Sequence, residues 1–145
     1  MSYFETIDGP IGSTHGSPPE RLCWQVKDAT LHGPRITARL AAPGLDWVRV
    51  DPDGTRRPDL RAQLRTDDGA LVLLHYEVAV IRASERFEEA LANGEPTDFD
   101  EQYMRMAPVF EVGASRYWWL TQSLFLGRGR MHGPRAIEYE IYRIA

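Results

Sequence analysis

The sequence lacks several features that would assign it to a class directly. It has a single cysteine, Cys23, so it cannot form an internal disulfide and gives no sign of an oxidising compartment. Its 17 lysines and arginines are outnumbered by 21 aspartates and glutamates, and the net charge of −4 argues against a dedicated nucleic-acid-binding protein. No apolar run reaches the roughly 20 residues of a membrane helix, and no basic segment followed by an apolar stretch opens the chain. We therefore expect a cytoplasmic protein that binds neither nucleic acid nor membrane.

The sequence also has none of the short motifs that hold common cofactors and metals. There is no glycine-rich phosphate loop entering a helix and no serine-nucleophile motif. His15, His32, His75 and His132 show no metal-ligand spacing, and Asp67-Asp68-Gly69 is explained by turn chemistry. We therefore expect neither a cofactor nor a metal.

What the sequence does contain is a succession of short strand-like segments separated by glycine and proline. Ile36, Ala38 and Leu40 alternate with polar residues, as expected for a strand with one buried face. Comparable segments lie at 21–27, 46–50, 60–65, 70–81, 103–112, 116–126 and 136–144. We predict a single all-β domain over residues 1–145, an antiparallel β-barrel with one short helix.

Three further stretches are predicted to be turns within this barrel or an arm that extends from it. Residues 1–20 are rich in glycine, proline, serine and threonine, so we predict an N-terminal arm with a short strand near Tyr3 to Ile7. Asp28-Ala29-Thr30 and Pro43-Gly44 are predicted to be turns. These assignments divide the first fifty residues into several short strands.

One segment has helical periodicity instead. Phe87, Ala90 and Leu91 share one face of a helix, Ser84 is a suitable N-cap, and Gly94 is a suitable C-terminal stop. The pattern predicts a helix over 84–93.

The stretch from Arg65 to Tyr76 carries the strongest hairpin signal. Asp68-Gly69 lies between two strand-like runs, and glycine supplies the positive φ that such a turn needs. In the run 70–81, apolar residues occur at both odd and even positions, so we predict that both faces of this strand are covered. A ligand pocket or a second subunit would explain the additional cover. His75 and Tyr76 are neighbours on this strand, so only one of them faces the interior.

Several local patterns, taken together, resemble the domain-of-unknown-function 3237 family of small, mostly bacterial proteins. They are His32-Gly33-Pro34-Arg35, Gly44-Leu45-Asp46-Trp47, Arg65-Thr66-Asp67-Asp68-Gly69-Ala70, Pro108-Val109-Phe110-Glu111-Val112-Gly113 and Phe125-Leu126-Gly127-Arg128-Gly129. The resemblance covers roughly residues 5 to 143. It implies a compact antiparallel β-barrel and no established reaction. Val112 and Glu77-Val78 depart from the family pattern.

Two carboxylates are the main candidates for acid–base chemistry. Asp46 follows a glycine turn and precedes Trp47, and a carboxylate in an apolar, aromatic setting has a raised pKa. Glu111 is separated from Tyr103 and Arg105 by even numbers of residues, so all three would lie on the same face of a strand. The alternative for both acids is a structural role at a turn or a barrel end.

The remaining candidates are a histidine, two arginines and several aromatic residues. His75 is a possible acid or base, because histidine titrates near neutrality, or else a satisfied core or interface residue. Arg61 and Arg105 are candidates to bind an anionic oxygen, or alternatively to pair with the carboxylates. The candidate substrate-binding residues are the aromatic side chains of Tyr76, Tyr103, Tyr117 and Trp119. For the last two, core packing is the alternative.

These features support three hypotheses about function. The first is a cofactor-independent enzyme, an isomerase, lyase or hydratase, or cyclase, that acts on a small hydrophobic carbonyl-type or aromatic metabolite. The second is a carrier with the same pocket and no tuned acid, and the third is a structural oligomer module. In each case we expect a homodimer or higher homo-oligomer.

Overall fold

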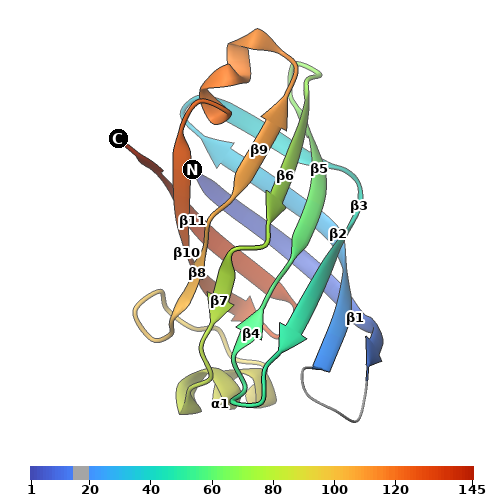
Figure 1. The fold of residues 1–145 in the computed structure, drawn as a ribbon, viewed down its shortest axis with the longest axis vertical. Coiled ribbons are helices and arrows are strands. Elements are labelled where there is room, and N and C mark those ends of the chain that lie inside the picture. The colour runs from blue at the N-terminus through green and yellow to red at the C-terminus, as the bar shows by residue number, and fades with distance from the viewer. Residues whose placement is uncertain (15–19) are drawn as a thin grey trace.

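The computed structural model describes residues 1–14 and 20–145, which form an elongated antiparallel β-barrel (Figure 1). Residues 15–19 of the expected arm, with His15, lie outside the described residues. The elements are β1 (Ser2–Thr14), β2 (Glu20–Gly33), β3 (Ile36–Val50), β4 (Arg56–Arg57), β5 (Leu60–Thr66), β6 (Leu71–Tyr76), β7 (Ala79–Ile81), α1 (Glu85–Asn93), β8 (Met104–Met106), β9 (Val109–Val112), the 3₁₀ helix η1 (Ser115–Leu120), β10 (Leu124–Gly133) and β11 (Ala136–Ile144).

The predicted antiparallel β-barrel is confirmed: it is closed and has eight strand positions around its wall. The hydrogen-bonded order is β2-β1-β11-β10-β8-β7-β4-β3-β5-β6-β9, and the β2–β3 pair completes the ring. Three of the eight positions are each occupied by two short strands in succession, separated by a short break. These pairs are β4 with β5, β6 with β7, and β8 with β9. Closure pairs the edges of β2 and β3 and encloses an interior, while β9 ends the order and has β6 as its neighbour among the described strands.

Alternation of apolar and polar residues accounts for the strands that the sequence predicts best. On β5, Leu60, Ala62 and Leu64 are buried while the residues between them are exposed. The Asp68-Gly69 hairpin is confirmed, with Gly69 at a φ of +91° between β5 and β6. The helix is also confirmed: Ser84 Oγ accepts a hydrogen bond from the Phe87 N–H, and Gly94 ends the helix in the left-handed conformation.

Several predicted boundaries are wrong because long strands continue through them. Residues 2–14 form strand β1, which pairs with both β2 and β11, so this part of the expected arm belongs to the barrel wall. The predicted turns at 28–30 and 43–44 are register shifts inside β2 and β3. A β-bulge bends a strand without ending it, and its glycine or polar residues resemble a turn in the sequence.

Other predicted strands are interrupted. The stretch 103–112 is divided into β8 and β9, and 70–81 is divided into β6 and β7. Burial alternates along β6, with Leu71 and Leu73 exposed on its outer face, so a single chain covers only the inner face of this strand. Residues 115–120 form η1 in place of the first half of a predicted strand, and β10 begins at Leu124.

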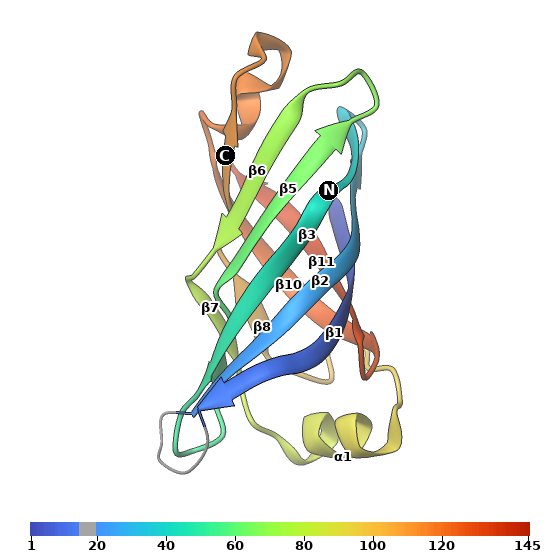
Figure 2. The ribbon, with the colours of Figure 1, turned by 90° about the vertical axis from the view of Figure 1, so that its right-hand side faces the viewer.

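The two ends of the barrel are built differently. Helix α1 lies at one end and η1 at the other (Figures 1 and 2). Among the described residues, neither α1 nor any other helix has the length and apolar character to cross a membrane.

Candidate functional site

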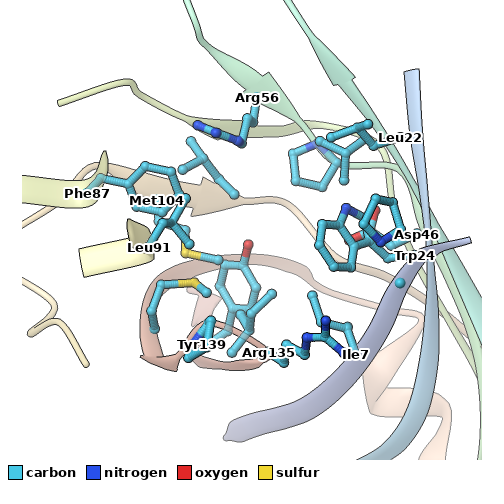
Figure 3. A pocket seen from close by; sticks show the side chains of 18 of the residues that line it. Ile7, Leu22, Trp24, Asp46, Arg56, Phe87, Leu91, Met104, Arg135 and Tyr139 are labelled. Atoms are coloured by element: carbon cyan, nitrogen blue, oxygen red, sulfur yellow. The ribbon is translucent and has the colours of Figure 1, made fainter. Parts of the chain in front are cut away.

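A cavity of about 420 Å³ lies beside α1, which contributes Phe87 and Leu91 to its lining. Apolar side chains from the barrel wall and the helix line most of it, among them Leu22, Trp24, Phe87, Leu91 and Met104. Figure 3 shows Phe87 and Leu91 of α1 on one side, with Trp24 and Asp46 across from them. A cavity of this size and character suits a small organic ligand.

Asp46 is the one carboxylate among the described residues that line this cavity. It lies on β3 opposite Trp24 of β2, its side chain is nearly fully buried, and one carboxylate oxygen accepts a hydrogen bond of 3.1 Å from the Asp59 N–H. Burial raises the pKa of Asp46 from 3.8 to about 7; the Asp59 hydrogen bond opposes this rise, and the Asp59 carboxylate adds to it. Asp46 therefore exchanges its proton near neutral pH.

A second buried carboxylate, Glu5 on β1, interacts electrostatically with Asp46. Glu5 is fully buried and accepts a hydrogen bond of 2.7 Å from the Tyr3 hydroxyl, while its other oxygen has no hydrogen-bond partner among the described residues. Burial and then the nearby Asp46 raise the pKa of Glu5 from 4.5 to about 8. Because two close carboxylates do not both ionise readily, the pair as a whole gives up its second proton less readily than its first.

Two tyrosines of the cavity wall lie near this pair. Tyr76 on β6 and Tyr139 on β11 are buried, with ring centroids 5.6 Å apart, and burial raises the pKa of both well above 10. The Tyr139 hydroxyl makes no well-formed hydrogen bond among the described residues. Both phenols stay protonated: the Tyr76 hydroxyl is directed toward the Tyr139 oxygen, and the Tyr139 hydroxyl is available to donate to a ligand oxygen.

Gly129 on β10 makes room for the Tyr139 ring. The two residues are register partners, and a Cβ on Gly129 would lie 2.7 Å from Cε1 of Tyr139 and 2.8 Å from Cγ of Met104. A larger residue at this position would therefore displace Tyr139 from the cavity wall.

The structure brings two of the predicted site residues together in the cavity, Asp46 and Tyr76. Tyr103, Arg105 and Glu111 do share one face, but it is the outer one: Glu111 is exposed and Arg105 stacks on the Tyr103 ring at 4.8 Å. Arg61 also points outward from β5. The alternation of residues along a strand predicted which side chains share a face. It did not predict whether that face points to the barrel interior or to the solvent.

Trp119 and Tyr117 lie at the η1 end, away from the cavity. Trp119 packs against Phe125 and lies under the Arg35 guanidinium at 4.4 Å. The Tyr117 hydroxyl donates to Asp68 at 2.8 Å. Both residues stabilise the packing of η1 against the barrel, which is the alternative that the sequence left open.

His75 lies on the outer side of β6, where its Nε2 is 3.4 Å from an Asp59 oxygen. Glu77 completes a group whose ligand atoms lie within 4.8 Å of one another. Of the residues the structure describes, Asp59, His75 and Glu77 are thus the ones placed to share a cation. Histidine spacing did not reveal them because two of the three are carboxylates.

Glu5, Tyr3 and Tyr139 were not predicted as site residues from the sequence. A signal for Glu5 was present, since it alternates with the apolar Tyr3 and Ile7 and so occupies a core position of a strand. Assigning residues 1–20 to an arm concealed that signal. Nothing local in the sequence indicates that β1, β3 and β11 bring these groups together.

The chain is similar along its length to proteins of one family. A family model described as "Protein of unknown function (DUF3237)" matches residues 5–144. A UPF0311 protein of Rhodopseudomonas palustris (strain TIE-1) is 33% identical over 106 residues, which cover 72% of this chain and 68% of that protein.

Solved structures show the same barrel. A conserved protein of unknown function from Rhodopseudomonas palustris superposes with a TM-score of 0.87 at 25% identity, over 99% of this chain and 93% of that chain. A beta-barrel-like protein from Acinetobacter baumannii AYE superposes with a TM-score of 0.79 at 27% identity, over 99% of this chain and 92% of that chain. The chain therefore belongs to the DUF3237 family of proteins of unknown function.

Proposed function

We propose that this protein is a cofactor-independent enzyme that performs general acid–base chemistry in the cavity beside α1. The observation that carries the proposal is Asp46, a carboxylate on the wall of an apolar cavity with a pKa of about 7. A group that titrates near the working pH is best suited to accept and return a proton.

Each polar group has a distinct role in this proposal. Asp46 is the base that removes a proton from the substrate. Tyr139, toward which the Tyr76 hydroxyl is directed, donates a hydrogen bond to the oxygen on which negative charge develops, a part that the sequence analysis gave to Arg61 or Arg105. Glu5 acts through Asp46: its buried carboxyl group lies close to Asp46 and raises the cost of charging both, while Asp46 is the group of the pair that lines the cavity.

The surroundings favour a small hydrophobic substrate with a carbonyl or an aromatic ring. The described lining is mostly apolar, and its oxygen-bearing side chains are Asp46, Tyr76 and Tyr139, so a substrate oxygen is directed to them. Proton transfer at such a compound leads to isomerisation, to hydration or elimination, or to cyclisation. All three need a base and a hydrogen-bond donor, and none needs an electron carrier.

Titration of Asp46 tests the central observation without a substrate. Carbon-detected NMR of protein labelled at the Asp and Glu carboxyl groups is expected to show a carboxyl signal that titrates near pH 7 and is absent in Asp46→Asn. If every signal that disappears in Asp46→Asn titrates near pH 4, the proposed base is already ionised throughout the neutral range and the proposal fails.

Turnover provides the second test once a substrate is found by screening small carbonyl and aromatic compounds. Loss of a general base costs on the order of 10² to 10⁴ in rate, so Asp46→Asn should lower kcat by about that factor and leave binding in place. Glu111→Gln is the matched control, because Glu111 is an exposed carboxylate on the outer face of β9. Equal turnover in both variants would contradict the assignment of Asp46.

A carrier function is the alternative, and it shares the cavity. The raised pKa of Asp46 favours the enzyme, because a carrier has no need of a buried carboxyl group that titrates near neutrality. The cavity itself favours both over a purely structural module.

We also propose that the chain forms a homodimer. Leu71 and Leu73 are adjacent on the outer face of β6, with exposed fractions of 41% and 36%. Apolar side chains at such positions are commonly covered in an assembly. Sedimentation velocity should show a species larger than the 16.5 kDa monomer, and Leu73→Lys should return it to the monomer. A monomer at all micromolar concentrations would contradict this proposal.

A further inference from the structure

The cavity lining carries an imbalance of charge. Among the described lining residues, two are cationic, Arg56 and Arg135, and Asp46 is the one acid. Asp46 is partly neutral at pH 7, because burial raises its pKa. The lining is thus positive although the whole chain has a net charge of −4.

Arg56 comes from β4, at the side of the cavity next to α1. Its guanidinium lies over the Phe87 ring at 5.0 Å and pairs with Glu88 at 2.8 Å. About a quarter of the Arg56 side chain is exposed, whereas half of the Glu88 side chain is. The arginine is therefore held by the helix while its acidic partner remains in solvent.

Arg135 comes from the turn between β10 and β11. It is more exposed than Arg56 and pairs with Asp8 of β1 at 3.0 Å. Both acidic partners, Glu88 and Asp8, are about half exposed and neither lines the cavity. Ion pairs of this kind contribute little stability, so an incoming anion can replace either carboxylate at small cost.

We propose that the natural ligand is an amphipathic organic anion, with an apolar body inside the cavity and a carboxylate or similar group bound by one of the two cationic lining residues, Arg56 or Arg135. Arginine presents a fixed fork of donors that suits such a group. One of these arginines binds the anionic end, and Asp46 and Tyr139 receive the reactive end. This inference specifies the substrate class of the proposed enzyme and rests on the same cavity.

Two fluorescent probes that share one body test the inference. Anilinonaphthalene sulfonate carries an anionic group, and N-phenylnaphthylamine has the same aromatic rings without it. We expect the double variant Arg56→Gln/Arg135→Gln to bind the sulfonate about tenfold more weakly while the affinity for the neutral probe changes by less than about twofold. The single variants show which of the two arginines binds the anionic end.

Two controls locate the effect. Arg61→Gln removes an exposed arginine from the outer face of β5 and should change the affinity for neither probe. Leu91→Trp places a larger side chain into the cavity from α1 and should weaken both probes, with circular dichroism used to establish that the barrel remains folded.

Three results would overturn the inference. They are unchanged sulfonate binding in the double variant, an equal loss for both probes in that variant, and sulfonate binding that is insensitive to a folded Leu91→Trp. None of these results depends on turnover or on the titration of Asp46. Failure of the anion site and failure of the proposed base are therefore observed separately.

Discussion

The two ends of the barrel hold aspartates with opposite properties. Asp46, beside α1, is buried among apolar side chains and has a raised pKa. Asp68, beside η1, accepts hydrogen bonds from Arg116, Thr66 and Tyr117, and these hold its pKa far below the usual range. Asp68 is thus held ionised by its hydrogen-bond donors, as in a structural contact, whereas Asp46 is placed as in a reactive site. The difference arises because the neighbours of a carboxyl group, rather than its residue type, set its free energy of ionisation.

The tetrapeptide His-Gly-Pro-Arg, which occurs at 32–35 and again at 132–135, shows the same difference between the two ends. It forms the β2–β3 turn at one end and the β10–β11 turn at the other. Arg35 of the first copy stacks over Trp119, whereas Arg135 of the second lines the cavity. Identical local sequence thus makes similar turns, and the surroundings give their arginines different partners.

The largest expected effect concerns the pH dependence of stability at the Asp46 end. Folding raises the pKa values of Asp46 and Glu5 to about 7 and about 8, so between about pH 4 and 8 the folded state binds more protons than the unfolded state. This pair therefore makes the free energy of unfolding fall as pH rises through that window. The double variant Asp46→Asn/Glu5→Gln should remove this fall and, at pH 8, be more stable than the wild type by on the order of a few kcal/mol.

Urea denaturation at a series of pH values measures this difference. Glu111→Gln should follow the wild-type curve, since that carboxylate is exposed. A double variant that loses stability with rising pH as steeply as the wild type would show that the buried pair does not titrate in this range.

A smaller effect separates two buried hydroxyls. Tyr3→Phe leaves the buried Glu5 carboxyl group without its hydrogen-bond donor and should cost about 1–3 kcal/mol of stability. Tyr139→Phe removes a hydroxyl that has no well-formed hydrogen bond, so stability should be unchanged or slightly higher while turnover falls. Thermal unfolding of the two variants makes the comparison, and a large loss in Tyr139→Phe would show that its hydroxyl has a structural partner.

The smallest expected effect concerns Asp68 at the η1 end. The depressed pKa of Asp68 means that its contribution to stability is present above about pH 4 and is lost as pH falls through the acid range, the opposite sign to Asp46. Because the group is exposed, Asp68→Asn should lower Tm by only a few degrees at neutral pH and should flatten the acid limb of the curve. A loss of cavity-probe binding in this variant would show that the two ends are coupled.

Local patterns were sufficient for the elements whose signals are local. The helix over 85–93 was predicted from its cap, its apolar face and Gly94, and the β5–β6 hairpin from Asp68-Gly69. β1 was missed because its proline and glycine residues resemble those of a loop. η1 was missed because Tyr117, Trp118 and Trp119 favour strands, whereas the chain here crosses from β9 to β10.

The sequence by itself determined the barrel class, the helix, the main hairpin and the candidacy of Asp46 and Tyr76, because periodicity and turn chemistry act over a few residues. The tertiary structure alone decided which face of each strand lies inside, and it placed Tyr103, Arg105 and Glu111 outside. It also brought Glu5 and Tyr139 toward Asp46 across strands that are far apart in the chain. Ionisation depends on that three-dimensional burial, so the chemistry of the site is determined by the fold as a whole.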